Sequence, residues 1–328
     1  MSLRKYVRLA KHLQMLPLLE SGEETLIGGQ AVLEGVMMRS PHSYCVAVRR
    51  AGGDTITERS ALARVSEKYP IFRYPVLRGL GTLGQAMWLG IRALFFSTNV
   101  AVDDAEPARE HPKPAQTSSW VMWLNLTIMV LFFLFLYKFV PLVAATAIGG
   151  HVAALHSRLA INMVDGVIRI GILLTFLSLM ARTRDMRRLF QYHGAEHKVV
   201  FNFESGRPVT VENAQTFTTF HPRCGTSFML VMMVIAMIVY ALVPVDGFAA
   251  KLAVRVGLLP LVIGVSYELI RFAARRQGSF LAMLTAPGLW LQRVTTKPPS
   301  DDQAAIAIQA LEGAMELEKA NGGELVIA

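Results

Sequence analysis

The chain has 328 residues, of which 53% are hydrophobic and 17% are charged, and its net charge is +9. A soluble globular domain carries about 25% charged residues, so this composition and the mean hydropathy of +0.40 predict a membrane protein in contact with the lipid bilayer. The basic residues lie beside apolar segments without a nucleic-acid recognition motif, so we expect no nucleic-acid partner.

Residues 1–74 predict an N-terminal cytoplasmic module that contains a β-hairpin. The run SYCVAVRR alternates apolar and polar residues, AGGD is a turn signal, and TITER can return as the partner strand. The first residues, MSLRKYVRLAKHLQMLPLL, are basic but lack an uninterrupted apolar core and a cleavage site. They predict a surface-lying start rather than a signal peptide.

Residues 75–97 are apolar but contain Arg78, Arg92 and several glycines. We expect an interfacial or re-entrant helix here, although a fifth membrane-spanning element is compatible with the same stretch. Residues 98–119 are rich in Pro, Ser and charged residues, which predicts a linker.

Residues 120–286 predict a transmembrane bundle, because a helix needs about 20 apolar residues to cross a bilayer. Four stretches meet this requirement: 120–148, 161–181, 226–245 and 251–274. In the second stretch, Asp165 and Arg169 are four residues apart and can pair along one helix face. The predicted fold class is therefore mainly α, a polytopic helical membrane protein with an interfacial or re-entrant helix and a small β-containing module.

The distribution of basic residues predicts the orientation, because short loops rich in Lys and Arg stay in the cytoplasm. The basic residues between the second and third spans are Arg182, Arg184, Arg187, Arg188, Lys198, Arg207 and Arg223. The loop 149–160 has a single Arg and 244–250 has none, so these face outward. We expect both termini, the loop 182–225 and the tail 287–328, with a helix at 301–320, in the cytoplasm.

His193, Glu196 and His197 form the pattern H-x-x-E-H, the inverted order of the zincin motif. Two histidines four residues apart lie on one face of a helix, where neutral imidazoles can chelate one ion. A neighbouring carboxylate can deprotonate water as a general base. The pattern predicts a site for Zn²⁺ or another divalent metal, with Glu196 as the catalytic residue. A pair of interfacial histidines is the alternative interpretation.

Three further residues are candidate metal ligands: His221 and Cys224 in HPRCG, and Glu268 in the fourth span. Each has a structural alternative. Pro222 and Gly225 punctuate the chain, so HPRCG is also compatible with a simple turn at a helix start. A carboxylate within a membrane span needs a partner, and Glu268 could pair instead with Arg169, Arg255 or Arg271.

Four residues are candidates for substrate binding. Gln30, Glu34 and Arg39 are polar groups in a mostly apolar stretch and could line a pocket, although a buried hydrogen-bond network explains them equally. Arg223 lies beside the predicted metal ligands. Together with the arginines at 182–188 it surrounds the site with positive charge, which favours an anionic or lipid-linked substrate.

Five segments in order carry a resemblance to a known family: GGQAVLEGVMMRSP, YHGAEHKVVFNFESG, HPRCGTSF, SYELIR and PGLWLQRVTTKPPSDDQ. Together they resemble the YqhQ-like family of bacterial membrane proteins over residues 24–310. That family is uncharacterised and is described as predicted metal-dependent enzymes. The resemblance implies a multi-pass protein of the bacterial cytoplasmic (inner) membrane with a metal, and it implies no particular reaction.

Two arrangements of ligands imply two functions. If both histidines and one further group hold the ion and a position is left for water, the protein is a metal-dependent hydrolase at the cytoplasmic membrane boundary. If His221 and Cys224 complete a closed tetrahedron with both histidines, the zinc is structural. The protein is then a scaffold, transporter component or assembly factor. Glu196, which a structural site does not require, favours the hydrolase.

Overall fold

The structure, a computed structural model, describes residues 27–105, 119–152, 155, 157–221, 224–275 and 280–321. The predicted surface-lying segment at the N-terminus, and residues 106–118 of the predicted linker, lie outside these described residues. The described chain is mainly helical, with one small antiparallel sheet near its N-terminal end.

The sheet is a four-stranded meander, with strands in the order β1 to β4. Its strands are β1 Gly28–Val32, β2 Gly35–Arg39, β3 Ser43–Arg49 and β4 Thr55–Ala61. The hairpin predicted from SYCVAVRR and TITER is confirmed as β3 and β4, with Ser43 opposite Ala61 and Arg49 opposite Thr55.

Both faces of the sheet are covered by helices, which explains why β2 and β3 are buried along most of their length. Helix α3 (Leu77–Ala105) packs on one face, where Leu89 and Ala93 meet Met37 of β2. Helices α7 (Arg184–Glu204) and α13 (Asp301–Ala320) cover the other face around Met38. The predicted N-terminal module, the loop at 182–225 and the C-terminal tail therefore form one layered unit.

Helix α3 is longer than the helix predicted at 75–97. It continues to Ala105, and it is not among the described helices that are long and apolar enough to cross a membrane. Its apolar face is used against the sheet, and its glycines allow close packing. A Cβ atom at Gly79 would lie 2.6 Å from the side chain of Tyr267.

Three helical stretches among the described residues are long and apolar enough to span a membrane: Trp123–His151, Leu159–Met180 and Gly225–Leu242. The first combines α4 (Ser119–Leu134), a π-helical turn η4 (Phe135–Phe139) and α5 (Val140–His151). The other two correspond to α6 (Arg158–Met180) and α9 (Gly225–Leu242). These positions agree with three of the four predicted stretches.

The fourth predicted stretch is broken into α10 (Phe248–Gly257) and α11 (Leu259–Arg275), which meet at an angle of 47°. Gly257 ends the first helix, and Pro260 lies in the first turn of the second. Proline lacks the amide hydrogen that would continue the helical ladder, so a bend at this point is expected. Counting the bent pair as one span gives four.

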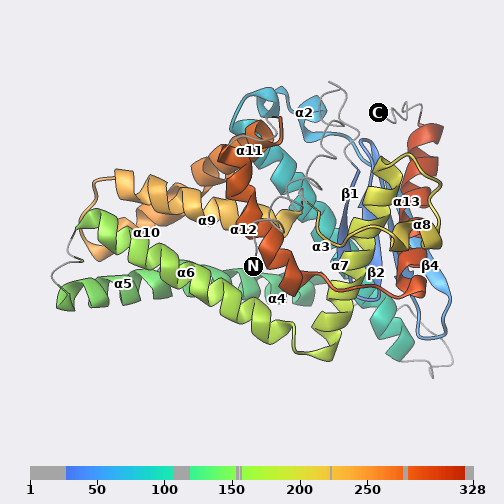
Figure 1. Cartoon of the computed structure of the whole chain (residues 1–328), viewed down its shortest axis with the longest axis horizontal. Coiled ribbons are helices and arrows are strands. Elements are labelled where there is room, and N and C mark those ends of the chain that lie inside the picture. The colour runs from blue at the N-terminus through green and yellow to red at the C-terminus, as the bar shows by residue number, and fades with distance from the viewer. Residues whose placement is uncertain are drawn as a thin grey trace.

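Helix α12 (Phe280–Thr295) was not predicted as a separate element. Its Leu291 is fully buried between Leu173 of α6 and Met233 of α9, so α12 belongs to the bundle. The remaining short elements are α2 Val65–Lys68, η3 Pro70–Arg73 and α8 Val211–Gln215. The sheet, α7 and α13 lie at one end of the molecule, and α5, α6 and α10 extend toward the other (Figure 1).

The C-terminal helix predicted at 301–320 is confirmed as α13, and Glu318 fastens it to the sheet. The buried Glu318 carboxylate accepts hydrogen bonds from the Ser40 hydroxyl at 2.6 Å and from the His42 amide at 2.8 Å. Burial acts to raise the pKa of Glu318, but these hydrogen bonds outweigh it and lower the pKa. Glu318 is therefore a stabilising anion in the folded chain.

We expect Glu318→Ala to lower the free energy of unfolding by about 3 kcal/mol, because it leaves buried donors without their charged acceptor. The control is Glu316→Ala, which removes a solvent-exposed pair with Arg59 and should cost at most about 1 kcal/mol. The Glu318 contribution is present above the unfolded carboxyl pKa of about 4.3 and is lost as the pH falls through the lower folded value. Thermal unfolding of both variants measures the difference, and equal losses would contradict it.

Candidate metal centre

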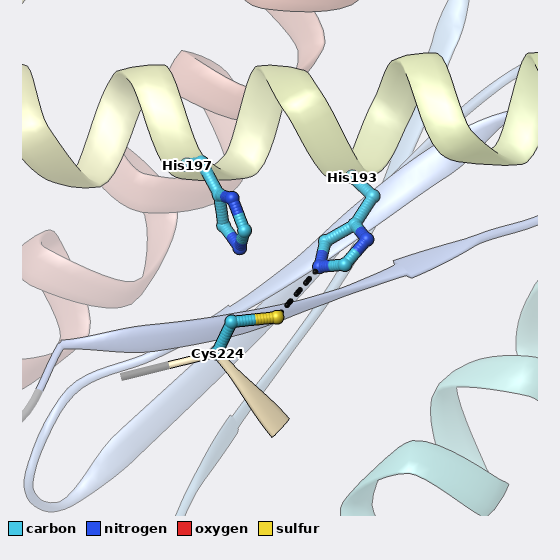
Figure 2. A group of neighbouring side chains, drawn as sticks. All are labelled: His193, His197 and Cys224. Carbon is cyan, nitrogen blue, oxygen red and sulfur yellow. Dashed lines mark hydrogen bonds between the residues drawn. The ribbon is translucent and has the colours of Figure 1, made fainter. Parts of the chain in front are cut away.

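Helix α7 brings the two predicted histidine ligands to one point. It begins after Thr183, whose hydroxyl accepts a hydrogen bond from the Met186 amide, and His193 and His197 lie four residues apart near its middle. Cys224, the residue immediately before α9, lies opposite them. One ligand atom from each of these three residues lies within 4.8 Å of the other two. Figure 2 shows both imidazoles pointing toward the Cys224 thiol.

The second ring nitrogen of each histidine is bonded to a backbone carbonyl. His193 Nδ1 lies 2.8 Å from the Thr295 oxygen, and His197 Nδ1 lies 2.5 Å from the Thr219 oxygen. A carbonyl can only accept, so both histidines carry their proton on Nδ1 and leave Nε2 as an acceptor. His193 Nε2 is 3.3 Å from Cys224 Sγ. This is how metal-binding histidines are usually held by their surroundings.

Both carbonyls come from segments that pack closely on α7. Thr295 ends α12, and the following segment approaches so closely that a Cβ atom at Gly194 would lie 2.0 Å from the Lys297 oxygen. The loop that holds Thr219 is fixed by Lys198, whose ammonium donates to two backbone carbonyls at 2.7 Å each. Burial lowers the pKa of Lys198. The sequence contained one signal for this packing, the glycine inside H-G-A-E-H.

Glu196 lies beside the histidines and is held by the first strand of the sheet. The Gly29 amide donates to Glu196 Oε1 at 3.1 Å, while Oε2 lies 3.9 Å from His193 Nε2. A Cβ atom at Gly29 would lie 2.6 Å from Glu196 Cγ, so a larger residue here would push the carboxylate away. The side chain of Glu196 is 10% exposed and that of His193 is 16% exposed. Both side chains are therefore largely shielded from solvent.

His221, a predicted ligand, is buried next to the centre but is not part of the three-residue group. Its Nε2 lies 3.5 Å from a carboxylate oxygen of Glu204, and its ring centroid lies 4.5 Å from that of Phe201. Its backbone amide donates to Gln292 at 2.7 Å. Burial lowers the pKa of His221 to about 4, so the imidazole is neutral at physiological pH.

Glu268, predicted as a metal ligand, is likewise not part of the group and pairs with Arg78. Its carboxylate accepts from Arg78 Nε at 2.6 Å and from the Val76 amide at 3.1 Å. Val76 has a φ of 67°, a strained conformation for a β-branched residue, and it directly precedes α3. Glu268 thus holds the entry to α3, and a negative charge suits the positive end of a helix dipole.

The predicted substrate-binding residues are dispersed. Gln30 packs against Gly90 of α3, and Arg39 shares the α3 face of the sheet with Met37, so neither lies on the α7 face where Glu196 is held. Burial lowers the pKa of the Arg39 guanidinium. Glu34 lies in the turn between β1 and β2, where it pairs with Arg188 of α7. Arg223 lies outside the described residues.

The pairing of Glu34 with α7 fixes the start of the helix. Arg188 donates to both Glu34 oxygens, and the Tyr192 hydroxyl donates to Oε2 at 3.3 Å. The hydrogen bond to Glu34 raises the pKa of Arg188, and burial raises the pKa of Tyr192. Of the two roles predicted for Glu34, substrate binding and a hydrogen-bond network, these contacts agree with the network, because they attach α7 to the sheet.

Comparison with known proteins assigns the chain to a family. It belongs to the family described as "Protein of unknown function (DUF1385)", which residues 74–317 match. It is also similar to the "Uncharacterized protein YqhQ" of Bacillus subtilis (strain 168), with 34% identity over 297 residues that cover 89% of this chain and 92% of that protein. No solved structure matches. The resemblance to the YqhQ-like family is confirmed, and both histidines, Glu196 and Cys224 lie within the matched region.

Proposed function

We propose that the protein is an integral membrane, divalent-metal-dependent hydrolase, with zinc as the preferred ion and its site at the cytoplasmic membrane boundary. The observation that supports this most strongly is the arrangement of His193 and His197. Both donate Nδ1–H to backbone carbonyls and turn toward the same thiol. Two imidazoles and one thiolate are a ligand set that suits zinc.

The number of ligands favours a catalytic centre over a structural one. Catalytic zinc sites use three protein ligands and keep a fourth position open, whereas structural sites close all four. The group among the described residues that could hold an ion has three members, His193, His197 and Cys224. The structural alternative requires His221 as the fourth ligand, and His221 is not a member of this group.

Glu196 is the residue that would move the proton. When bound, a divalent ion supplies Lewis-acid activation of water and of the bond to be cleaved. Glu196 Oε1 is occupied by the Gly29 amide, and Oε2, 3.9 Å from His193 Nε2, remains to accept a proton from the attacking water. The same carboxyl group can then return that proton to the leaving group.

A membrane location is supported by the apolar surface of the candidate spans. Only 17–33% of the residues in their most apolar windows are buried inside the protein, so most of these side chains have no protein partner to cover them. Large exposed residues on the first span include Trp123, Leu131, Phe132 and Phe135. Lipid is the medium in which such a surface is stable.

An anionic or lipid-linked substrate fits the charge near the centre. The N-terminal part of α7 carries Arg184 and Arg187, which are exposed, and Arg293 is exposed on the last turn of α12. Exposed basic side chains raise the local concentration of anions at a protein surface. At the boundary of a bilayer they also attract lipid headgroups.

The orientation is tested by reporter fusions. Because the loop 182–225 is rich in basic residues and 149–160 is not, a reporter at residue 205 should be active only in its cytoplasmic form. A reporter inserted between 149 and 160 should be active only in its external form. The reverse pattern would place the centre outside and contradict the proposal.

Metal content tests the ligands. Detergent-purified protein should hold one zinc per chain, and His193→Ala, His197→Ala and Cys224→Ala should each remove it, as measured by elemental mass spectrometry. His151→Ala, which removes an exposed histidine at the end of α5, is the control and should keep the metal. In a folded His221→Ala variant the metal should also remain. Its loss there would favour the closed, structural site instead.

Glu196→Gln tests the catalytic role, since it keeps size and removes the basic carboxylate. Loss of a general base typically costs about 10² to 10⁴ in rate, so the variant should keep its zinc and melting temperature but fail to complement a deletion of the gene. Glu212→Gln, an exposed glutamate on α8, is the matched control and should complement fully. Full complementation by Glu196→Gln would rule out the hydrolase.

A further inference from the structure

A second group of buried polar residues lies within the helical bundle, on elements that extend away from the sheet (Figure 1). It contains three basic side chains, Lys138, Arg169 and Arg255, which we call the basic cluster. Asp165 and Tyr240 lie among them. All five residues are at most 9% exposed. Neither the proposed hydrolase nor its ligands involve any of them.

The hydrogen bonds of the basic cluster converge on one carboxylate. Asp165 accepts from Arg169 at 2.6 Å through one oxygen and from Arg255 at 2.9 Å through the other. Lys138 instead donates to the Tyr240 hydroxyl at 3.2 Å. All three cations lie against the Tyr240 ring, at 5.4 Å for Lys138 and 5.7 Å for each arginine.

The positive charge of the cluster exceeds the negative charge that faces it. Asp165 offers one negative charge to two guanidinium groups, and a phenol and an aromatic ring stabilise a cation without neutralising it. Arg169 Nη1 is buried and has no hydrogen-bond partner among the described residues. Uncompensated charge in such an environment is costly, and where it persists it commonly marks a functional site.

The helix that carries Lys138 is irregular at this residue. Lys138 lies in the π-helical turn η4, which interrupts the helix between α4 and α5. A π-turn inserts an extra residue into the helical ladder and changes which side chain faces inward, and such turns are frequent at functional sites. Lys138 is the buried residue of this turn. The helix is therefore distorted at the point where a third cation enters the bundle.

A small cavity of about 30 Å³ borders the basic cluster at Tyr240 and Arg255. Lys251 and Asn162 also line it, and the rest of the lining is apolar: Ile161, Val243, Val245 and Val254. Within the described part of the chain, this lining contains two basic residues and no acidic one. One buried water needs roughly 10–15 Å³, so the cavity offers about the space of two waters or one chloride ion.

We propose that this cavity binds a small inorganic anion of about the size of chloride, held by Arg255 and Lys251. The anion offsets the excess positive charge of the basic cluster and thereby stabilises the bundle. The walls formed by Val243 and Val245 belong to the connector between α9 and α10, so the anion also ties this connector to α6 through Asn162.

Equilibrium dialysis of the detergent-purified full chain against radioactive chloride tests the proposal, with gluconate keeping the ionic strength constant. One chloride should bind per chain and raise the melting temperature in a saturable way, because a ligand that binds only the folded state stabilises it. Lys251→Met should weaken binding by about tenfold or more, the effect of losing one charge-assisted hydrogen bond. Lys251→Arg keeps the charge and should retain binding.

Lys319→Met is the matched control, because it makes the same substitution on the exposed side of α13. It should leave chloride binding unchanged. Absence of chloride binding by the wild-type chain, or equal binding by Lys251→Met and Lys319→Met, would overturn the proposal. Preferential binding of inorganic phosphate over chloride would contradict the proposed size of the anion. If Lys251→Met fails to fold, chloride binding by the wild-type chain still tests the proposal.

Discussion

The close contact between α7 and strand β1 is the constraint on which the candidate centre depends. Gly29 leaves room for Glu196 and donates its amide to one carboxylate oxygen, so the sheet determines where the other oxygen lies. Glu34, in the turn that follows the same strand, pairs with Arg188 of α7. Strand β1 and the turn after it therefore hold α7 at two points, Glu196 and Arg188. The histidines can then meet the Cys224 thiol without further adjustment.

Features that depend on local sequence could be predicted. The alternation in SYCVAVRR and TITER identified β3 and β4, the apolar lengths identified α6 and α9, and the i, i+4 spacing placed both histidines on one face of α7. The pairing of Asp165 with Arg169 within one helix was also predicted and is confirmed. Each of these follows from a periodicity or a spacing within a single element.

Features that depend on packing between distant parts of the chain could not be predicted from the sequence. Glu268 was expected to bind a metal or to pair with Arg169, Arg255 or Arg271. It forms hydrogen bonds with Arg78, which lies 190 residues away in a helix that was expected at the membrane surface. The carbonyl that orients His193 belongs to Thr295, and a backbone carbonyl leaves no trace in the residue type. Pro287 and Gly288 lie within helix α12 and have low helix propensity, so local sequence does not favour this helix. Gly288 packs closely against Ser227 of α9, a contact between distant parts of the chain.

The candidate centre is assembled from segments that lie far apart along the chain. The strand that holds Glu196 comes from the N-terminal part, both histidines from the middle, and the carbonyl that orients His193 from residue 295. Helix α13, which follows, packs with α7 on the same face of the sheet. The centre is therefore complete only after every helix of the bundle has been made and packed. Imidazole orientation and carboxylate position both depend on that packing. The affinity for the proposed metal should therefore rise sharply in the last step of folding, which would couple the proposed chemistry to the integrity of the whole chain.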